Sequence, residues 1–287
     1  MADLMTWIED ALAACPERTF QAKLHSELEE RIHKMTTTGV REGFTTITPY
    51  VIVVEIERLV DFAKQVFGAV ETSRAPGSAG GIHCELRIGD SMLMFGGGPA
   101  LRGYEKRNTL HLQAPDTDAV YQRALEAGGE SLFEPSDKPY GARDAGVRDP
   151  AGNSWFIATP LRPRPEPPPT VTPYLLIDND PLGYIEFLKS AFNAEQIASY
   201  KSPDGRLMHA ELRIGSAPIE MGQAPGLQCA FYLYVPDADA LYERAMAAGA
   251  KSVCTPMDQP WGDRMGGVED PWGNTWYIAS HFGSGRR

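Results

Sequence analysis

The sequence predicts an α+β fold in which one domain is present twice in tandem. Blocks of the first half recur in order in the second half, and within each copy the apolar period alternates between that of a strand and that of a helix. A proline-rich segment at 161–170 favours an extended linker between the copies. We therefore expect an N-terminal extension at 1–43 and domains at 44–160 and 171–282.

The repeat is visible in four pairs of matching blocks. They keep their order along the chain and differ slightly in spacing, as insertions and deletions in loops would cause. Four ordered matches are too many for chance, so the two domains should share one fold. The blocks pair Thr48-Pro-Tyr50 with Thr172-Pro-Tyr174, Ile82–Gly89 with Met208–Gly215, Tyr121–Gly128 with Tyr242–Gly249, and Tyr140–Trp155 with Trp261–Trp276.

Each domain is predicted to contain two βαβββ modules. The extension before them should form two amphipathic helices, because apolar residues recur every four positions from Leu4. In the first domain the β-branched run Val51–Val54 predicts a strand, and a helix should follow it and end at Gly68. The second module repeats this order, with Asp116 as the helix N-cap. Further strands are predicted at Val70–Ser73, Ile82–Ile88, Ser91–Phe95, Thr109–Ala114, Ser131–Phe133, Gly146–Arg148 and Ser154–Ala158.

Composition excludes several classes of partner. The 287 residues include 27 basic and 38 acidic side chains, so the formal net charge is −11. A negative protein is repelled by nucleic acid and by anionic membranes, and we expect neither as a partner. No apolar run approaches the roughly 20 residues that span a bilayer. Met1–Asp10 carries acids where a secretory signal would carry bases, so the protein is expected to be cytoplasmic.

At this point the motifs resemble a known family. Paired βαβββ modules that end in Asp-Pro-x-Gly-Asn-x-Trp, at Asp149–Trp155 and Asp270–Trp276, resemble the vicinal oxygen chelate superfamily of glyoxalases, extradiol dioxygenases and bleomycin-resistance proteins. Thr172-Pro-Tyr174, His209–Gly215 and Trp261–Arg264 resemble its PhnB-like branch. The resemblance implies that each pair of modules curls its sheet into a cup, which in the family holds a divalent metal such as Fe, Mn, Ni or Zn.

The residues at the implied metal positions are not normal ligands of a divalent ion, which prefers imidazole, thiolate or carboxylate. His111 lies two residues from one of these positions, on the same strand face, but it would need partners. We therefore expect no metal cofactor, with the family's divalent metal as the alternative. The positions fall on Thr48, Thr172, Thr109, Ala230, Phe156 and Tyr277.

Two His-x-Glu-x-Arg strands are candidates for acid–base chemistry. Alternation places His83 and Glu85 on one face of their strand, and His209 and Glu211 on one face of the repeated strand. A histidine beside a carboxylate can shuttle a proton, and we name His209 and Glu211 as candidate catalytic residues. The alternative is structural, with Glu paired to Arg and His as a hydrogen-bonded filler.

An aromatic pocket is the second candidate site. In Trp261-Gly-Asp263-Arg264 the ring offers a wall and Arg264 can bind an oxyanion, so this loop is expected to grip a ligand at the rim. Its counterpart Tyr140-Gly-Ala-Arg143 lacks the Asp, which places the preferred site in the second domain. The alternative is a filled core without a cavity. The expected ligand-binding residues are Tyr174, Tyr232, Tyr234, Trp261, Asp263, Arg264, Tyr277, His83, Glu85 and His111.

Two functions remain open from the sequence. The preferred hypothesis is a glyoxalase/bleomycin-resistance-like protein that binds a small aromatic or hydrophobic molecule in a cup without the usual metal ligands. The alternative is a metal-dependent or His/Glu-based lyase, isomerase or dioxygenase of the same superfamily. A structural reading treats the duplicate as a pseudo-dimer whose N-terminal helices contact a partner, such as a second copy in a homodimer.

Overall fold

The computed structural model describes residues 39–77, 80–162 and 167–282. The helices predicted before residue 39 lie outside the described residues, and 39–43 contain turns. The described ends of the linker, 161–162 and 167–170, contain neither helix nor strand.

The first half contains the two expected βαβββ modules. Strands extend up to five residues beyond the predicted bounds, most at β6. Module 1 comprises β1 (Ile47–Val53), α3 (Ile56–Phe67), β2 (Val70–Pro76), β3 (Ile82–Ile88) and β4 (Ser91–Gly97). A short 3-10 helix, η1 (Pro99–Leu101), precedes module 2, which comprises β5 (Thr109–Gln113), α4 (Thr117–Glu126), β6 (Glu130–Lys138), β7 (Ala142–Arg148) and β8 (Ser154–Pro160).

The second half repeats this order. Module 3 comprises β9 (Val171–Leu176), α5 (Pro181–Phe192), β10 (Glu195–Lys201), β11 (Leu207–Ile214) and β12 (Ala217–Gly222). Module 4 comprises β13 (Ala230–Tyr234), α6 (Ala238–Ala247), β14 (Lys251–Asp258), β15 (Asp263–Glu269) and β16 (Thr275–His281). The prediction of an α+β chain with four modules is confirmed.

The helix ends have local causes that the sequence shows. Helix α3 ends at Gly68, whose φ of 66° is a left-handed conformation that glycine adopts at little cost. Helix α4 begins after Asp116, whose carboxylate accepts a hydrogen bond from the Ala119 amide at 3.0 Å, as an N-cap should. Asp237 caps α6 in the same way.

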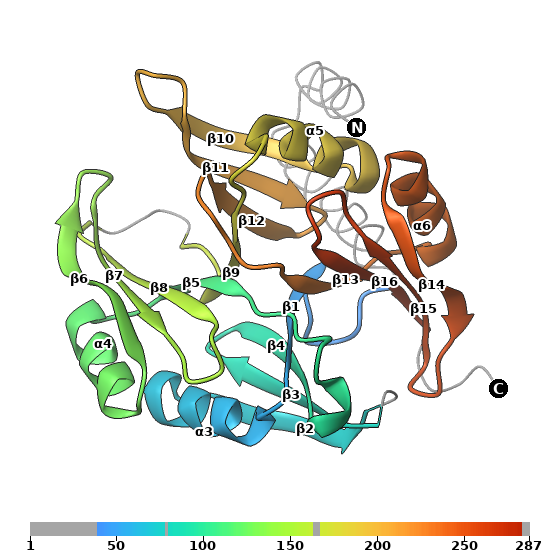
Figure 1. Cartoon of the computed structure of the whole chain (residues 1–287), viewed down its shortest axis with the longest axis horizontal. Helices are drawn as coiled ribbons and strands as arrows, with labels where there is room; N and C mark the ends of the chain where they lie inside the picture. Colours follow the sequence, from blue (N-terminus) through green and yellow to red (C-terminus); the bar gives the residue numbers. More distant parts are fainter. Residues whose placement is uncertain (1–38, 78–79, 163–166, 283–287) are drawn as a thin grey trace, which may run out of the picture.

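The two curved sheets combine modules from both halves (Figure 1). One sheet has the order β14-β15-β16-β13-β1-β4-β3-β2 and joins modules 1 and 4; the other has the order β10-β11-β12-β9-β5-β8-β7-β6 and joins modules 2 and 3. The antiparallel pairs β1–β13 and β5–β9 make the two junctions. Two curved sheets of two modules each were expected, but the idea that consecutive modules share a sheet is wrong.

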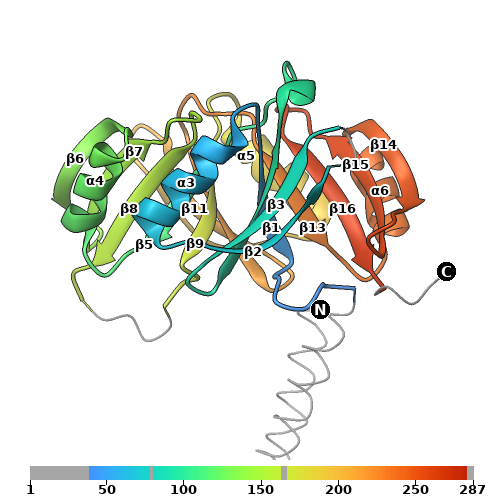
Figure 2. The ribbon, with the colours of Figure 1, turned by 90° about the horizontal axis from the view of Figure 1, so that it is seen from below.

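Among the described residues, the two largest hydrophobic cores, in contrast, lie within the halves, whereas a smaller cluster around Met94 and Tyr232 joins modules 1 and 4. One core contains apolar residues of modules 1 and 2, and the other contains those of modules 3 and 4. Only Ile47 and Val171, which occupy equivalent positions in β1 and β9, contribute to the core of the opposite half. Helices α3 to α6 pack on the outer sides of the sheets (Figures 1 and 2), and α3 contacts α4 as α5 contacts α6.

The Asp-Pro-x-Gly-Asn-x-Trp motifs stabilise these cores. Asp270 is buried and accepts hydrogen bonds from the indole of Trp276 at 3.0 Å and the hydroxyl of Tyr184 at 3.0 Å. Asp149 does the same for Trp155 at 2.9 Å in the first half. Burial raises the pKa of Asp270, although hydrogen bonds from Trp276 and Asn274 oppose that shift. Both indoles are fully buried, so each carboxylate satisfies a donor that would otherwise be orphaned.

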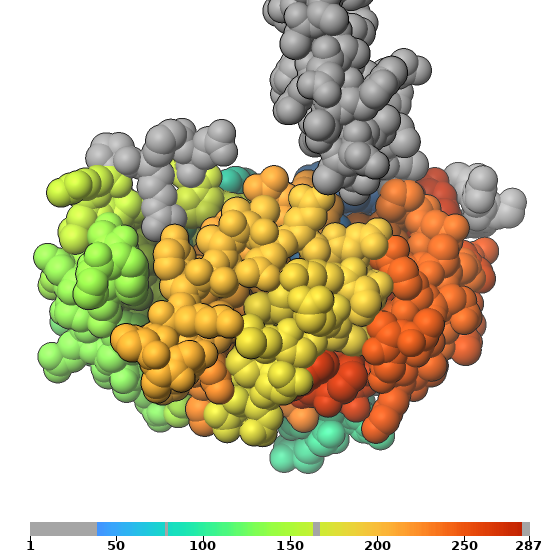
Figure 3. Space-filling model, turned by 90° about the horizontal axis from the view of Figure 1, so that it is seen from above, coloured from blue at the N-terminus to red at the C-terminus, as the bar shows by residue number. Residues whose placement is uncertain are grey.

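Contacts across the halves surround both junctions. Thr46 Oγ1 lies 3.0 Å from Ser216 Oγ, and the Thr170 amide donates to Asp90 Oδ1 at 2.8 Å in the equivalent place. Lys106 Nζ donates to the Gly273 carbonyl at 2.9 Å. In Figure 3 the surface of module 3, in yellow and orange, lies between those of module 2 in green and module 4 in orange-red. Across the described ranges, no helix combines the length and apolarity of a membrane span.

Because sheet pairing holds the halves together, cutting the linker should not separate them. A specific protease site inserted within 161–170 and then cleaved should leave two fragments that elute together at the size of the intact chain in size-exclusion chromatography. Native mass spectrometry should show their one-to-one complex. Fragments that separate at micromolar concentration without denaturant would contradict the cross-half pairing as the main connection.

Candidate functional site

Each sheet has one face on the cores and one face on a cup. In β1 the side chains of Val51 and Val53 enter a core, whereas Tyr50 and Ile52 line a cavity on the opposite face. This alternation follows from the two-residue period of a strand. We call the cavity face of the sheet of modules 1 and 4 the first cup, and the corresponding face of the sheet of modules 2 and 3 the second cup.

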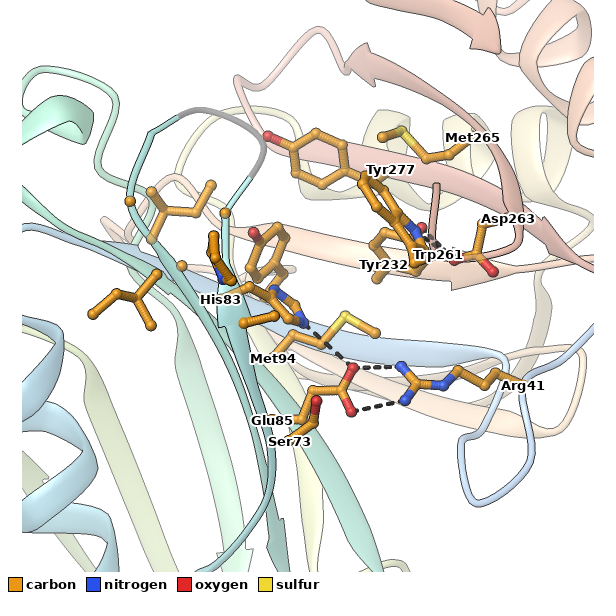
Figure 4. Close-up of a pocket in the computed structure, with 18 of the residues that line it drawn as sticks. Arg41, Ser73, His83, Glu85, Met94, Tyr232, Trp261, Asp263, Met265 and Tyr277 are labelled. Atoms are coloured by element: carbon orange, nitrogen blue, oxygen red, sulfur yellow. Dashed lines mark hydrogen bonds and ion pairs between the residues drawn. The ribbon is translucent and has the colours of Figure 1, made fainter. Parts of the chain in front are cut away.

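The first cup contains a cavity of about 350 Å³, a size typical of small-molecule sites. Figure 4 shows Trp261, Met265 and Tyr277 of module 4 across from His83 and Glu85 of module 1. The wall is therefore built by both halves of the chain. Its larger apolar and aromatic side chains are Tyr50, Met94, Tyr232, Trp261, Met265 and Tyr277.

The aromatic rings of the first cup contact one another at favourable angles. Tyr50 and Tyr277 meet edge to face with ring centroids 5.5 Å apart, and Tyr232 and Tyr277 stack at 6.4 Å. Tyr50 also meets the ring of His83 edge to face at 5.8 Å. Such pairs gain about 0.5–1.5 kcal/mol beyond burial of area, so the wall is ordered before any ligand arrives.

Asp263 organises the module 4 side of this cavity. It is 1% exposed and accepts hydrogen bonds from the Tyr232 hydroxyl at 2.7 Å and the Trp261 indole at 3.1 Å. His281 Nδ1 lies 2.6 Å from its other oxygen. The buried carboxylate of Asp263 thus fixes two aromatic rings of the cavity wall. Trp261 itself is 45% exposed and lies at the rim of the cavity.

An ion pair closes the opposite side. Arg41 binds both carboxylate oxygens of Glu85, and His83 Nε2 lies 3.3 Å from one of them (Figure 4). Burial alone would raise the pKa of Glu85, but the hydrogen bonds from His83 and Arg41 outweigh it and hold that pKa below its ordinary value. Glu85 is therefore ionised at neutral pH and engaged by both partners.

The second cup has a different chemistry. His111 Nδ1 lies 2.6 Å from Glu220 Oε2, and both side chains are largely buried. The Tyr140 hydroxyl donates to Asp144 at 2.5 Å, and burial raises the pKa of that carboxyl although the Tyr140 hydrogen bond opposes the shift. His209 also belongs to this cup, with Nδ1 3.4 Å from the hydroxyl of Tyr174.

The repeat makes the two cups comparable position by position. Tyr232 pairs with Thr48 in β13–β1, as His111 pairs with Thr172 in β5–β9. Met94 stands across from Tyr50 on the neighbouring strand, as Glu220 stands across from Tyr174. Methionine and tyrosine in the first cup thus replace carboxylate and imidazole of the second. A further methionine, Met265, corresponds to Asp144, since each follows the arginine of its aromatic-Gly-x-Arg motif.

The first cup differs from the second in the donors that its strands present. Thr48, Met94 and Tyr277 supply a hydroxyl, a thioether and a phenol, which are poor donors for divalent ions. The second cup presents one imidazole and one carboxylate in contact. Among residues 39–77, 80–162 and 167–282, no three His, Cys, Asp or Glu side chains form a group that could hold an ion.

The predicted site residues divide between the two cups. His209, proposed as catalytic, lies in the second cup with Tyr174 and His111, and Glu211 lies on the same strand across from Glu220. Arg264 lines neither cup, because it pairs with Asp239 and Asp258 beside α6. Seven of the predicted residues line the cavity of the first cup: Tyr232, Tyr234, Trp261, Asp263, Tyr277, His83 and Glu85.

Sequence reasoning missed several residues of these sites. Arg41 lies in the segment predicted to be part of the N-terminal extension. Met94 and Met265 are apolar and belong to no motif that indicates a binding site. The sequence could have pointed to Glu220, because it lies on the last strand of module 3. The sequence analysis considered the last strands of modules 2 and 4 alone as sources of metal ligands. His281 is the last residue of β16. It lies beyond the second Asp-Pro-x-Gly-Asn-x-Trp motif and belongs to no motif itself.

Comparison with known proteins agrees with this two-cup architecture. The family model described as glyoxalase/bleomycin resistance protein/dioxygenase superfamily matches residues 43–157 and 170–278. An uncharacterized protein of Mycobacterium bovis is 35% identical over 125 residues, which cover 38% of this chain and 82% of that protein. An uncharacterized protein of Mycobacterium tuberculosis has the same identity over 125 residues, or 73% of its length.

Solved structures share the fold. Glyoxalase I from Zea mays matches with a TM-score of 0.62 at 15% identity, over 82% of this chain and 92% of that one. A putative dioxygenase from Bacillus subtilis matches with a TM-score of 0.57 at 14% identity, over 82% and 84% of the two chains. The architecture is that of a tandem protein of paired βαβββ modules. The chain belongs to the glyoxalase/bleomycin resistance protein/dioxygenase superfamily.

Replacing Glu85 by Gln should destabilise the fold by about 1–2 kcal/mol at neutral pH, because Arg41 keeps its charge without a carboxylate partner. The folded pKa of Glu85 is lowered from 4.5, so its contribution is present above that pH and is lost as the pH falls through the folded pKa. Urea unfolding at several pH values should therefore show the wild type and E85Q converging in acid. E211Q, at the equivalent position of module 3, should change stability by less than about 0.5 kcal/mol. A constant difference between wild type and E85Q down to strongly acidic pH would contradict the assignment.

Proposed function

We propose that the protein binds a small aromatic or hydrophobic molecule in the first cup, without a divalent metal there, as a sequestering or resistance-type member of its superfamily. The observation that carries this proposal is the cavity of about 350 Å³ with a wall of aromatic rings and thioethers. Its charged groups support the same proposal, since Glu85 and Asp263 are already hydrogen-bonded by protein donors and lie almost fully buried.

Direct inspection of the purified protein tests the proposal. Mass spectrometry after denaturation should identify a co-purifying aromatic or apolar molecule, and metal analysis should find Fe, Mn, Ni and Zn well below one equivalent. A stoichiometric divalent ion that is lost in variants of Tyr277 or Met94 would reverse the assignment of the first cup.

Truncation of the rim should weaken binding of a simple aromatic probe. In W261A the affinity for 2-ethylnaphthalene should fall about tenfold or more, because a large ring that covers the bound molecule is lost. Y140A removes the equivalent rim residue of the second cup and should leave the affinity nearly unchanged. Isothermal titration calorimetry or equilibrium dialysis gives both constants, and equal losses in the two variants would argue against the first cup as the binding site.

A second candidate function is supported by the His111–Glu220 contact. A carboxylate on one ring nitrogen orients an imidazole and increases its basicity, which is the arrangement of a general base. This observation favours an acid–base enzyme, such as an isomerase or lyase, working in the second cup. It differs from the His209 and Glu211 assignment made on sequence, although all four side chains belong to the same sheet.

If this candidate is correct, the protein should catalyse exchange of acidic C–H protons of carbonyl compounds with D2O, measured by proton NMR. H111N and E220Q should each lower that exchange by about 100-fold, a usual contribution of one acid–base group. W261A, in the first cup, should retain it. Exchange that survives in both H111N and E220Q but disappears in H209A and E211A would instead assign the acid–base chemistry to His209 and Glu211.

A further inference from the structure

Two phenol hydroxyls on the cavity wall of the first cup have no hydrogen-bond partner among the described residues: those of Tyr50 and Tyr277. The other polar ring groups there are engaged, since Tyr232 and Trp261 both donate to Asp263. Tyr50 comes from β1 and Tyr277 from β16, so each half of the chain supplies one hydroxyl. Neither hydroxyl belongs to the fully buried side-chain oxygens without a partner, which among the described residues are those of Thr48, Asn108 and Asp144, so a ligand or water can accept from both.

The local packing holds Tyr50 in this place. Its hydroxyl lies where a side chain at Gly96 would be, 2.8 Å from the position of a Cβ atom there. Only glycine at position 96 therefore lets the phenol lie flat over β4. Tyr277 is braced by edge-to-face contact with Tyr50 and by stacking on Tyr232.

Both phenols act as donors at neutral pH. Burial raises the pKa of Tyr50 far above its ordinary value, and the neighbouring Tyr277 adds to the shift. Burial also raises the pKa of Tyr277. The two hydroxyls therefore keep their protons, and each can donate a hydrogen bond to a ligand.

The charges around the cavity disfavour ionised ligands. Glu85 and Asp263 line the cavity, but protein donors already hydrogen-bond both carboxylates, so a cation would have to compete with those donors for their oxygens. An anion would approach two buried carboxylates, while the nearby guanidinium of Arg41 is already bound bidentately by Glu85. Either ion would lose its hydration without gaining a compensating partner, which is costly in an apolar site.

We infer that the first cup selects an uncharged aromatic molecule that carries a carbonyl oxygen, of the aryl ketone or quinone type. This inference rests on the proposed binding function and specifies its ligand. The aromatic body lies among Trp261, Met265 and Tyr277, and the carbonyl oxygen accepts from the hydroxyls of Tyr50 and Tyr277. Thioethers such as Met94 and Met265 suit this ligand, because sulfur packs well against aromatic rings.

The test uses the full-length protein and four probes that share one ring system. They are 2-acetylnaphthalene, its apolar counterpart 2-ethylnaphthalene, the anion 2-naphthoate and the cation formed by 2-(aminomethyl)naphthalene at pH 7. Equilibrium dialysis should show the ketone bound about tenfold more tightly than the ethyl compound, as expected for two neutral hydrogen bonds. Both ions should bind more weakly than either neutral probe.

A matched variant tests the two hydroxyls. The double change Y50F/Y277F keeps both rings and should reduce the preference for ketone over ethyl compound to about one. Y174F, which removes the equivalent hydroxyl of the second cup, should keep the tenfold preference. Loss of the cooperative thermal transition would show that the double variant does not fold. In that case the ratio of the wild-type affinities for the ketone and the ethyl compound tests the inference alone.

The outcomes separate the two claims. Equal binding of ketone and ethyl compound, or a preference for either ion, overturns the inference and leaves the apolar binding function standing. Failure of all four probes to bind overturns the binding function and this inference together. A preference for the ketone that persists in a folded Y50F/Y277F also overturns the assignment of the hydroxyls.

Discussion

The pairing of β1 with β13 and of β5 with β9 determines the rest of this structure. Because side chains on a strand alternate between two faces, each sheet must cover a core with one face and expose the other. The two main cores stay within each half, whereas the sheets cross between the halves. Every cup is therefore assembled from both halves, and neither half can form one alone. Of the described linker residues, Thr170 extends the β5–β9 pairing, since its carbonyl accepts a hydrogen bond from the Gln113 amide at 2.8 Å.

This constraint also explains what the sequence could and could not predict. Gly68 and Asp116 mark helix ends because their signals are local, and the repeated blocks predicted all four modules. The strand partner of β1 is not a local property, since its apolar face would suit either neighbour. As a result His209 was grouped with Trp261 on sequence, although their modules belong to different sheets. Arg41 could not be placed, because its partner Glu85 lies 44 residues away.

Duplication has left two related cups with opposite chemistry. At equivalent positions the first cup has Met94 and Tyr232 where the second has Glu220 and His111. Each such replacement removes a group able to carry charge and enlarges the apolar wall. The first cup retains carboxylates only where protein donors surround them, at Glu85 and Asp263. A single fold thus carries a cavity lined by aromatic rings and thioethers in one cup and a His111–Glu220 contact in the other, and the side chains alone determine this difference.

The buried carboxylates of the first cup determine the shape of its cavity. Asp263, which is 1% exposed, holds Trp261 and Tyr232 in place by hydrogen bonds from the indole and the phenol. Glu85 holds Arg41 against the opposite side in the same manner. Side chains fixed before binding lose little conformational entropy when a ligand arrives, so a modest apolar contact area yields more affinity than in a mobile pocket. Under the proposed binding function, the ionic groups of this cup therefore act by holding the side chains of the cavity wall in a fixed shape.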